Sequence, residues 1–183
     1  FKTLLFKIIE SWQNHEDKLR DNANKISEFL NKKEEGAINH ITKDTVKKAA
    51  QSLIKSHDKK YGGFGFAPKF PMPHICMFLL KYYLEFDDEK ALKACENTLL
   101  SIYKGGIHDH IGGGYFRYST DEKWIVPHFE KMLYDNALLA IAFAFAFSHT
   151  KKEIYKEASI DILNFLNKDM KSPFGAFYSS LSA

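Results

Sequence analysis

Most of the side chains in this sequence that could perform chemistry lie between Gly105 and Asn136. This region holds three histidines, several carboxylates, several aromatic rings and Arg117, one of only two arginines in the chain. Histidine exchanges protons near neutral pH, and a guanidinium group offers two parallel donors to a carboxylate or phosphate. The region therefore predicts proton transfer and anion recognition rather than core packing.

The side chains predicted to transfer protons are three histidines and one glutamate: His108, His110, His128 and Glu130. His108 and His110 flank Asp109 in a loop bounded by glycines. In extended backbone, the two histidines would share one side and the aspartate would face the other. The His-Asp-His segment is therefore not automatically a metal site, and we predict neither a metal nor another cofactor. Hydrogen bonds that only stabilise the loop are the alternative role.

A second set of residues is predicted to bind and orient a small molecule: Asp109, Arg117, Tyr118, Trp124, Lys69, Tyr134 and Asp135. The ring of Trp124 could stack on the C–H face of a sugar, because aromatic faces pack well against such groups. The alternatives are structural. Arg117 could form an ion pair that pins the loop, and Trp124 could simply pack inside the protein.

The apolar run from Leu138 to Phe147 predicts a helix over about 129–148 with little polar surface. If this helix begins at His128, then His128, Lys131 and Asp135 share one face. The N-terminal end of a helix favours a negative charge, so a polar cluster there suits an anionic or polar ligand. A helix this apolar must be covered on most sides, which predicts a larger helical assembly.

Hydrophobic periodicity predicts an all-α chain. The expected helices cover 2–33 (one helix or two end to end), 42–57, 73–86, 88–104, about 129–148 and 152–168. A glycine followed by an aromatic residue occurs after the second, fourth and sixth helices, at Gly63-Phe64, Gly114-Tyr115 and near Gly175. Such a repeat predicts helical hairpins, about three of them, stacked around an arc or ring.

The composition fits a water-soluble chain of 183 residues with a net charge of +3. Lysines and carboxylates are interleaved, which disfavours a nucleic-acid partner, and the longest apolar run is too short to span a membrane. Cys76 and Cys95 lie in helical segments and are predicted to be buried free thiols, as expected in the reducing cytoplasm. The chain begins with Phe1 and ends without a helix closure, so we expect a piece of a longer protein, with possible self-association through exposed apolar helix faces.

Three long motifs, at 62–71, 105–124 and 126–139, resemble the family of thioredoxin-domain-containing proteins that includes spermatogenesis-associated protein 20 and the bacterial protein YyaL. The resemblance implies a partial (α/α)6 toroid of the six-hairpin glycosidase type, similar in shape to N-acylglucosamine 2-epimerases. It further implies that residues 1–35 are a helical connector after a thioredoxin-like domain. Residues 36–183 would be the first part of the toroid domain, truncated at its C-terminus.

Two functions are consistent with these features. The first is binding of a sugar-like substrate at the toroid centre, with isomerisation or epimerisation through proton abstraction beside a carbonyl. This fits histidines better than glycoside hydrolysis, which usually needs two carboxylates at a defined separation. The alternative is a non-catalytic helical scaffold that partners a thioredoxin-like domain in redox or protein-interaction work. No Cys-x-x-Cys motif occurs in this sequence, so thiol-disulfide chemistry is not assigned to it.

Overall fold

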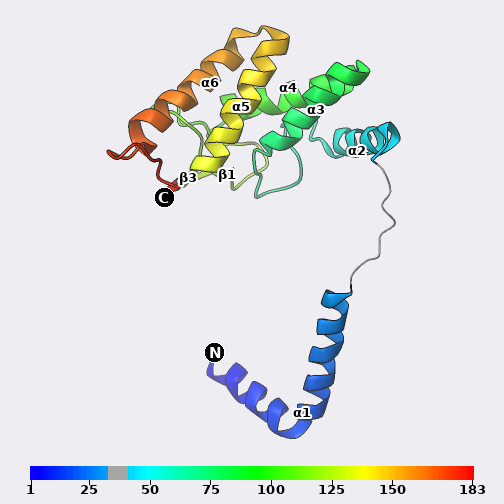
Figure 1. Ribbon diagram of the computed structural model, residues 1–183. Helices are drawn as coiled ribbons and strands as arrows, with labels where there is room; N and C mark the ends of the chain where they lie inside the picture. The colour runs from blue at the N-terminus through cyan, green and yellow to red at the C-terminus, as the bar shows by residue number, and fades with distance from the viewer. Residues whose placement is uncertain (33–40) are drawn as a thin grey trace. The chain divides into compact units, whose positions relative to one another are not determined.

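The computed structural model describes residues 1–32 and 41–183, which divide into two compact units at His40 and Ile41 (Figure 1). The predicted boundary between a connector and a toroid domain, at residues 35 and 36, lies outside the described residues. Among the helices of the described ranges, none has both the length and the apolar character needed to cross a membrane.

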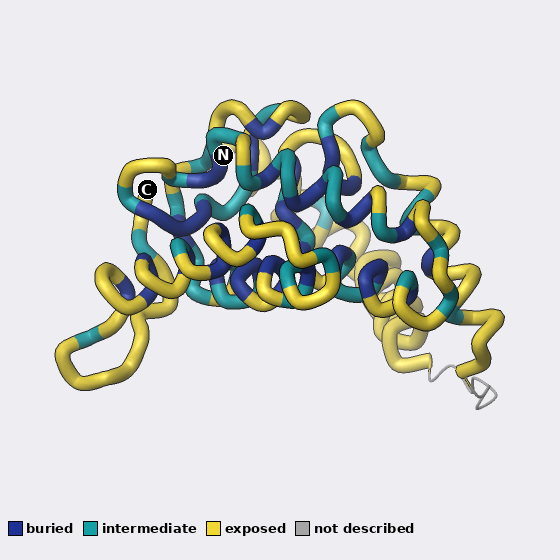
Figure 2. The backbone as a smooth tube through the Cα atoms, turned by 90° about the horizontal axis from the view of Figure 1, so that it is seen from above, coloured by how far each residue is buried: buried dark blue, intermediate teal, exposed yellow. Residues whose placement is uncertain are grey.

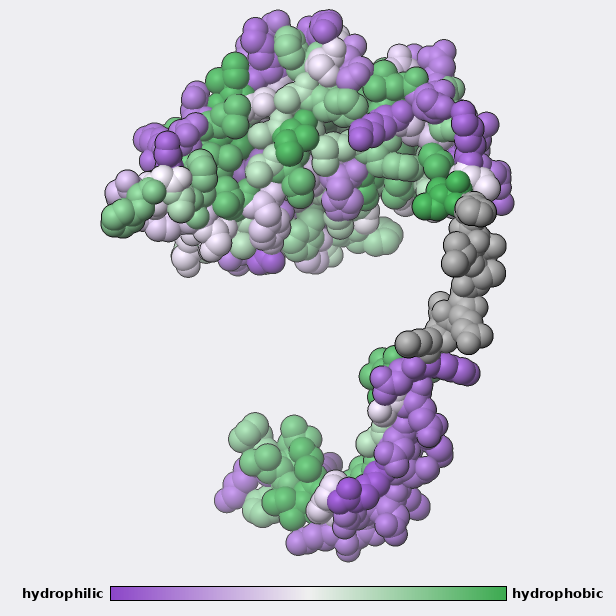
Figure 3. Space-filling model, in the orientation of Figure 1, coloured by the Kyte–Doolittle hydropathy of each residue, from purple (hydrophilic) through white to green (hydrophobic). Residues whose placement is uncertain are grey.

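The first unit contains one long helix, α1 (Lys2–Asn31), which bends at His15. The backbone of His15 is not helical (φ −143°, ψ 32°), and it lies where the predicted hydrophobic periodicity is interrupted. No residue of α1 is buried within its unit, and Figure 3 shows hydrophobic side chains gathered on its first half. Association of this apolar face with another copy stays a prediction.

The second unit is built from five α-helices that lie close to their predicted positions. They are α2 (Lys43–Ser56), α3 (Pro73–Phe86), α4 (Glu89–Lys104), α5 (Leu133–Thr150) and α6 (Glu153–Phe165), and a π-helical turn η1 (Leu166–Met170) extends α6. The side chain of Thr42 caps α2 by accepting a hydrogen bond from the amide of Thr45, and Asp88 caps α4 in the same way through the amide of Lys90. Both caps satisfy amide groups that the helix itself leaves free.

The helices form two hairpins, α3 with α4 and α5 with α6, and α2 packs against α3 and α4. α3 and α5 contact each other and carry the highest proportion of apolar residues, so they form the inner layer of the unit. Figure 2 shows buried positions alternating with exposed ones along the helical turns of the chain. Cys76 of α3 and Cys95 of α4 are both free and fully buried, as predicted. The third predicted hairpin would need α1, which belongs to the other unit.

Four two-residue strands lie in the connections: β1 (Tyr118–Ser119), β2 (Pro127–His128), β3 (Lys131–Met132) and β4 (Ser180–Leu181). β1 pairs with β2, and β3 pairs with β4, both antiparallel. These ladders correct the predicted start of the fifth helix. Residues 127–128 and 131–132 are paired strand residues with a bend at Phe129 between them, so α5 begins only at Leu133. The predicted helical face shared by His128, Lys131 and Asp135 therefore does not form.

Each Gly-aromatic turn closes in the same way. An isolated antiparallel bridge joins the residue before the turn to the aromatic residue after it, in the pairs His57–Phe64, His108–Tyr115 and Lys171–Phe177. The turns after α2 and α4 match further, because the amide of Asp58 donates to the carbonyl of Gly63 and the amide of Asp109 donates to that of Gly114. The predicted repeat is therefore present in the backbone.

The first turn offers a direct test of this packing. Gly63 and Gly65 both have positive φ (+84° and +81°), but a Cβ at Gly63 would lie 2.5 Å from the ring of Trp124, whereas nothing lies within 4 Å of one at Gly65. We expect Gly65→Ala to lower the free energy of unfolding by about 1 kcal/mol through backbone strain alone. Gly63→Ala should cost about 2 kcal/mol more because the ring must move. Urea unfolding followed by circular dichroism measures both, and equal losses would contradict the packing of Trp124 against this turn.

Candidate functional site

The predicted site residues that come together lie where β1 and β2 meet the start of α5. We call this group the His128 cluster: Arg117, Tyr118, His128, Glu130, Tyr134 and Asp135. The register of the ladder places Tyr118 opposite His128, and their rings stack with centroids 4.9 Å apart. Phe70 packs against the Tyr118 ring at 4.8 Å. The aromatic contacts therefore fix the plane of the His128 imidazole.

Arg117 and Glu130 form the charged part of the cluster. Arg117 Nη1 donates to Glu130 Oε2 at 2.9 Å, and the backbone amide of Arg117 donates to the carbonyl of Glu130 at 2.8 Å. The hydrogen bond to Glu130 raises the pKa of the Arg117 guanidinium, with a further contribution from Tyr134. The half-exposed Tyr134 therefore lies beside a guanidinium that stays charged.

Two polar atoms of the cluster have no hydrogen-bond partner, although both are buried: Arg117 Nε and His128 Nδ1. His128 Nδ1 lies 4.0 Å from Glu130 Oε2, which is too far for a hydrogen bond. Buried polar groups in folded proteins nearly always have partners, so an unpaired donor and an unpaired imidazole nitrogen in one cluster point to a ligand.

Asp135, in the first turn of α5, has an altered acidity. Burial raises the pKa of its carboxyl group to about 6, the charge of Glu130 adds to this effect, and the charge of Arg117 opposes it. A carboxyl group with a pKa near 6 can both accept and release a proton close to neutral pH. The cluster thus contains two groups, His128 and Asp135, that are suited to proton transfer.

The structure separates the other predicted histidines from this cluster. The ring nitrogens of the buried His108 lie 2.9 Å from the carbonyl oxygen of Tyr103 and 3.2 Å from Asp161 Oδ2. His110 is exposed, and its Nε2 lies 3.2 Å from the carbonyl oxygen of Gly105. Both ring nitrogens of His108 thus have protein oxygens as partners, which favours the loop-stabilising alternative, while proton transfer by His108 and His110 stays a prediction.

Asp109 is held by protein groups, which favours a structural role; ligand binding by Asp109 stays a prediction. Its carboxylate accepts hydrogen bonds from the amides of Ile111 and Gly112, and Lys131 Nζ donates to it at 2.7 Å. Burial raises the pKa of Asp109, but these bonds outweigh that effect and bring the pKa down to about 2. Lys131 itself is buried and also donates to the carbonyl of Gly113.

Lys69 and Trp124 are buried, which favours structural roles for both; their roles in ligand binding stay predictions. Lys69 is fully buried, and its Nζ donates to Asp58 Oδ2 at 2.7 Å and to the carbonyl of Glu122 at 3.0 Å. Trp124 is 1% exposed, and its Nε1 donates to the carbonyl of Tyr61 at 2.9 Å. No face of the indole is free to stack on a sugar, because long-range packing against the first turn covers it.

Sequence reasoning missed the partners that hold these residues: Asp58, Lys131 and Asp161. One signal was available. The segments His-Asp-Lys-Lys-Tyr-Gly-Gly-Phe (57–64) and His-Asp-His-Ile-Gly-Gly-Gly-Tyr (108–115) share one pattern, and in both the aspartate pairs with a lysine further along the chain. As for metals, residues 1–32 and 41–183 contain no group of three or more histidine, cysteine or carboxylate side chains placed to hold an ion.

No family model matches the sequence. Spermatogenesis-associated protein 20 of Homo sapiens is 38% identical to this chain over 192 residues, which cover all of the chain and 24% of the relative. The protein of the same name in Rattus norvegicus is 34% identical with the same coverage, and the uncharacterized protein B0495.5 of Caenorhabditis elegans is 32% identical over 26% of its length. The whole chain is thus similar in sequence to one part of spermatogenesis-associated protein 20. It spans about a quarter of the length of these relatives.

Solved structures with a similar fold are enzymes that act on sugars. A sugar epimerase from a ruminal bacterium superposes with a TM-score of 0.65 at 14% identity, over 72% of this chain and 36% of the other. The cellobiose 2-epimerase of Spirochaeta thermophila gives 0.63 at 16% identity, over 79% and 42%. A D-mannose isomerase gives 0.58 at 19% identity, over 75% and 39%. These likenesses confirm the predicted fold class, part of an α/α toroid.

The raised pKa of Asp135 has a consequence for stability. Because the folded-state pKa of about 6 exceeds the ordinary value of 3.8, the folded state loses stability as the pH rises from about 4 to 6. We expect Asp135→Asn to raise the free energy of unfolding by about 1 to 2 kcal/mol at pH 7 and to have little effect near pH 3.5. Chemical denaturation at several pH values measures this.

The control Asp44→Asn, in the exposed first turn of α2, should be neutral or slightly destabilising at pH 7. A loss of stability in Asp135→Asn at pH 7 would contradict the burial argument.

The pH dependence of stability has the opposite sign at Asp109. Its folded-state pKa of about 2 lies below the ordinary value, so its ion pair with Lys131 contributes stability above pH 4 that is lost as the pH falls toward 2. Lys131→Met should therefore cost about 1 to 2 kcal/mol more at pH 7 than at pH 2. Lys81→Met, on the exposed surface of α3, provides the control and should show no such dependence. A deficit in Lys131→Met that stays constant with pH would exclude this coupling.

Proposed function

We propose that the His128 cluster binds a sugar-like molecule and moves a proton on the carbon beside its carbonyl group, in an isomerisation or epimerisation. The observation that supports this most directly is the pair of unpartnered buried atoms, Arg117 Nε and His128 Nδ1, in one cluster. A hydrogen-bond donor and a proton acceptor at adjacent positions suit the two ends of such a substrate: the carbonyl oxygen and the neighbouring C–H group.

The proposed reaction needs no oxidant or reductant. A base removes the proton from the carbon beside the carbonyl, and the electron pair of that C–H bond forms an enediolate whose oxygen is stabilised by Arg117. Return of the proton to the opposite face of the same carbon gives the epimer, whereas return to the neighbouring carbon gives the isomer. His128 is the proposed base, and Asp135 is the group of suitable acidity for the second proton transfer. Glu130 holds Arg117 in place.

The structural neighbours include enzymes of this reaction class. A sugar epimerase, a cellobiose 2-epimerase and a D-mannose isomerase share the fold, although an identity below 25% makes that likeness evidence for the fold alone. The choice of reaction therefore depends on the cluster itself. We also propose a cytoplasmic location, because both cysteines of the chain are buried free thiols.

A helical scaffold that partners a thioredoxin-like domain is the second candidate. One observation favours it: Lys69, Lys131 and His108, all within the motifs of the resemblance, are tied to other protein groups rather than facing a ligand. On this view the motifs maintain the fold of the turns. The two candidates differ in the role of His128. The enzyme needs it as a base, whereas the scaffold does not need it.

The test is exchange of the substrate proton with solvent. The chain is incubated in D₂O with cellobiose or D-mannose, and deuterium incorporation beside the carbonyl is followed by NMR. We expect His128→Asn to lower the exchange rate by at least about 100-fold, since a positioned base contributes that much or more. His149→Asn, at the exposed far end of α5, should leave the rate unchanged. Absence of exchange in the folded wild type would favour the scaffold, and exchange that survives in His128→Asn would exclude His128 as the base.

A further inference from the structure

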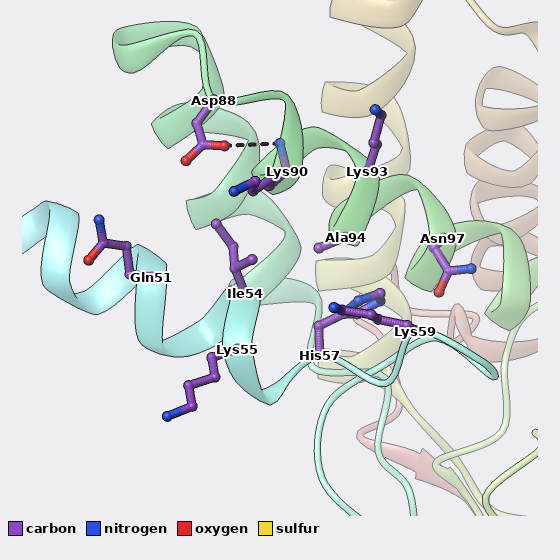
Figure 4. Close-up of a pocket in the computed structure, with 10 residues that line it drawn as sticks. All are labelled: Gln51, Ile54, Lys55, His57, Lys59, Asp88, Lys90, Lys93, Ala94 and Asn97. Carbon is purple, nitrogen blue, oxygen red and sulfur yellow. Dashed lines mark hydrogen bonds between the residues drawn. The ribbon is translucent and has the colours of Figure 1, made fainter.

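A cavity of about 730 Å³ lies between α2 and α4, away from the His128 cluster (Figure 4). Its lining residues are Gln51, Ile54, Lys55, His57, Lys59, Asp88, Lys90, Lys93, Ala94 and Asn97. The volume lies within the range of sites that bind small molecules. Ile54 and Ala94 give the cavity an apolar part, and polar side chains surround them.

The charge around this cavity is positive. Four lysines line it, and none of them forms an ion pair with a carboxylate in the part of the chain that the structure describes. The single lining carboxylate, Asp88, is engaged as the cap of α4, where it accepts a hydrogen bond from the amide of Lys90 at 2.9 Å. In Figure 4, Lys59 reaches across His57, whereas Lys55 and Lys93 extend away from the other lining side chains. Lys59 and Lys90 are therefore the lysines placed to neutralise a bound anion.

The two repeated turns show what is missing at this cavity. In the second turn, the amide of Gly114 and His108 Nε2 both contact Asp161 Oδ2 of α6, at 2.9 and 3.2 Å. In the first turn, the amide of Gly63 donates instead to Thr98 Oγ1 of α4 at 3.0 Å. Thr98 thus stands where Asp161 stands in the second turn, and the first turn lacks the carboxylate.

The histidine of the first turn is left without that partner. His57 Nε2 and Asn97 Oδ1, which line the same cavity, are both buried and complete no hydrogen bond within the described residues. Burial lowers the pKa of His57, which favours the neutral ring, and the nearby Asn97 side chain opposes this effect as an acceptor. A buried ring nitrogen without a completed hydrogen bond, beside lysines that form no ion pair, suits an acceptor that carries negative charge.

We propose that the cavity between α2 and α4 binds a small organic anion whose phosphate or carboxylate group takes the place that Asp161 occupies in the second turn. An oxygen of this group accepts a hydrogen bond from His57 Nε2. Lys59 and Lys90 balance its charge, and its apolar body packs on Ile54 and Ala94. This site is separate from the proposed sugar site and does not depend on it.

Isothermal titration calorimetry with four probes tests the proposal: phenyl phosphate, benzoate, inorganic phosphate and phenol. We expect phenyl phosphate or benzoate to bind more tightly than inorganic phosphate, which lacks the apolar body, and than phenol, which lacks the charge. The stronger of the two organic anions identifies the acidic group. Lys59→Gln and Lys90→Gln should each weaken this binding by about fivefold, the effect of losing one partly exposed charge contact.

Two further variants make the test specific. Lys48→Gln, an exposed lysine of α2 outside the cavity, removes the same charge and should change the affinity by less than about twofold. Thr98→Asp supplies the missing carboxylate from within and should abolish binding, provided that circular dichroism shows a folded protein. The proposal is overturned if phenol binds as tightly as the organic anions, if neither anion binds saturably, or if Lys48→Gln weakens binding as much as the cavity variants do.

Discussion

Two buried ammonium groups hold the loops of this protein in place. Lys69 and Lys131 are nearly inaccessible to water, and a buried lysine is tolerated only where acceptors compensate for its lost hydration. Lys69 Nζ pairs with Asp58 and Lys131 Nζ pairs with Asp109, each at 2.7 Å, and both aspartates lie at the start of a Gly-aromatic turn. Each ammonium group also donates to a backbone carbonyl. The pairs connect residues 11 and 22 positions apart. They therefore fix loops that have almost no regular structure of their own.

The His128 cluster depends on these pairs. Lys131 lies in β3, three residues after His128 and next to Glu130, so its anchoring to Asp109 sets the position of the whole segment before α5. Lys69 does the same for the other side, because its amide and carbonyl pair with Ser119, the residue after Tyr118. The polar groups around the cluster thus nearly all have hydrogen-bond partners, whereas Arg117 Nε and His128 Nδ1 have none within the described residues. Polar groups left unpaired in a rigid, otherwise paired environment are suited to bind a ligand without further rearrangement.

Local signals predicted the helices well and the long-range contacts poorly. Thr42, Pro73 and Asp88 mark helix starts that the structure reproduces, because capping depends on neighbouring residues only. The start of α5 was predicted too early, since the segment before it is held by pairing with β1, which is close in the sequence, and with β4, which is about 50 residues away. The burial of Trp124 against the first turn is also a long-range contact.

The members of the His128 cluster were predicted from their types, but sequence alone could not separate them from His108, Asp109 and His110. Hydrophobic periodicity does not show which polar side chain already has a partner. The repeat does carry that information in part: two aspartates in equivalent turns point to one structural role, whereas Arg117, His128 and Asp135 have no counterpart in the first turn. A polar residue that recurs with the fold unit is more simply explained by the fold, and one that does not recur is the stronger candidate for function.

The same comparison of the two turns distinguishes His57, which follows α2, from His108, which follows α4. His57 and His108 occupy equivalent backbone positions, and each pairs through its backbone with the aromatic residue seven positions later. The side chain that meets the turn amide differs between them, Thr98 in the first turn and Asp161 in the second. Asp161 also contacts the imidazole of His108, whereas the hydroxyl of Thr98 brings no charge to His57. The first turn thus keeps the histidine without the carboxylate, and in our proposal an external anion completes the same set of bonds there.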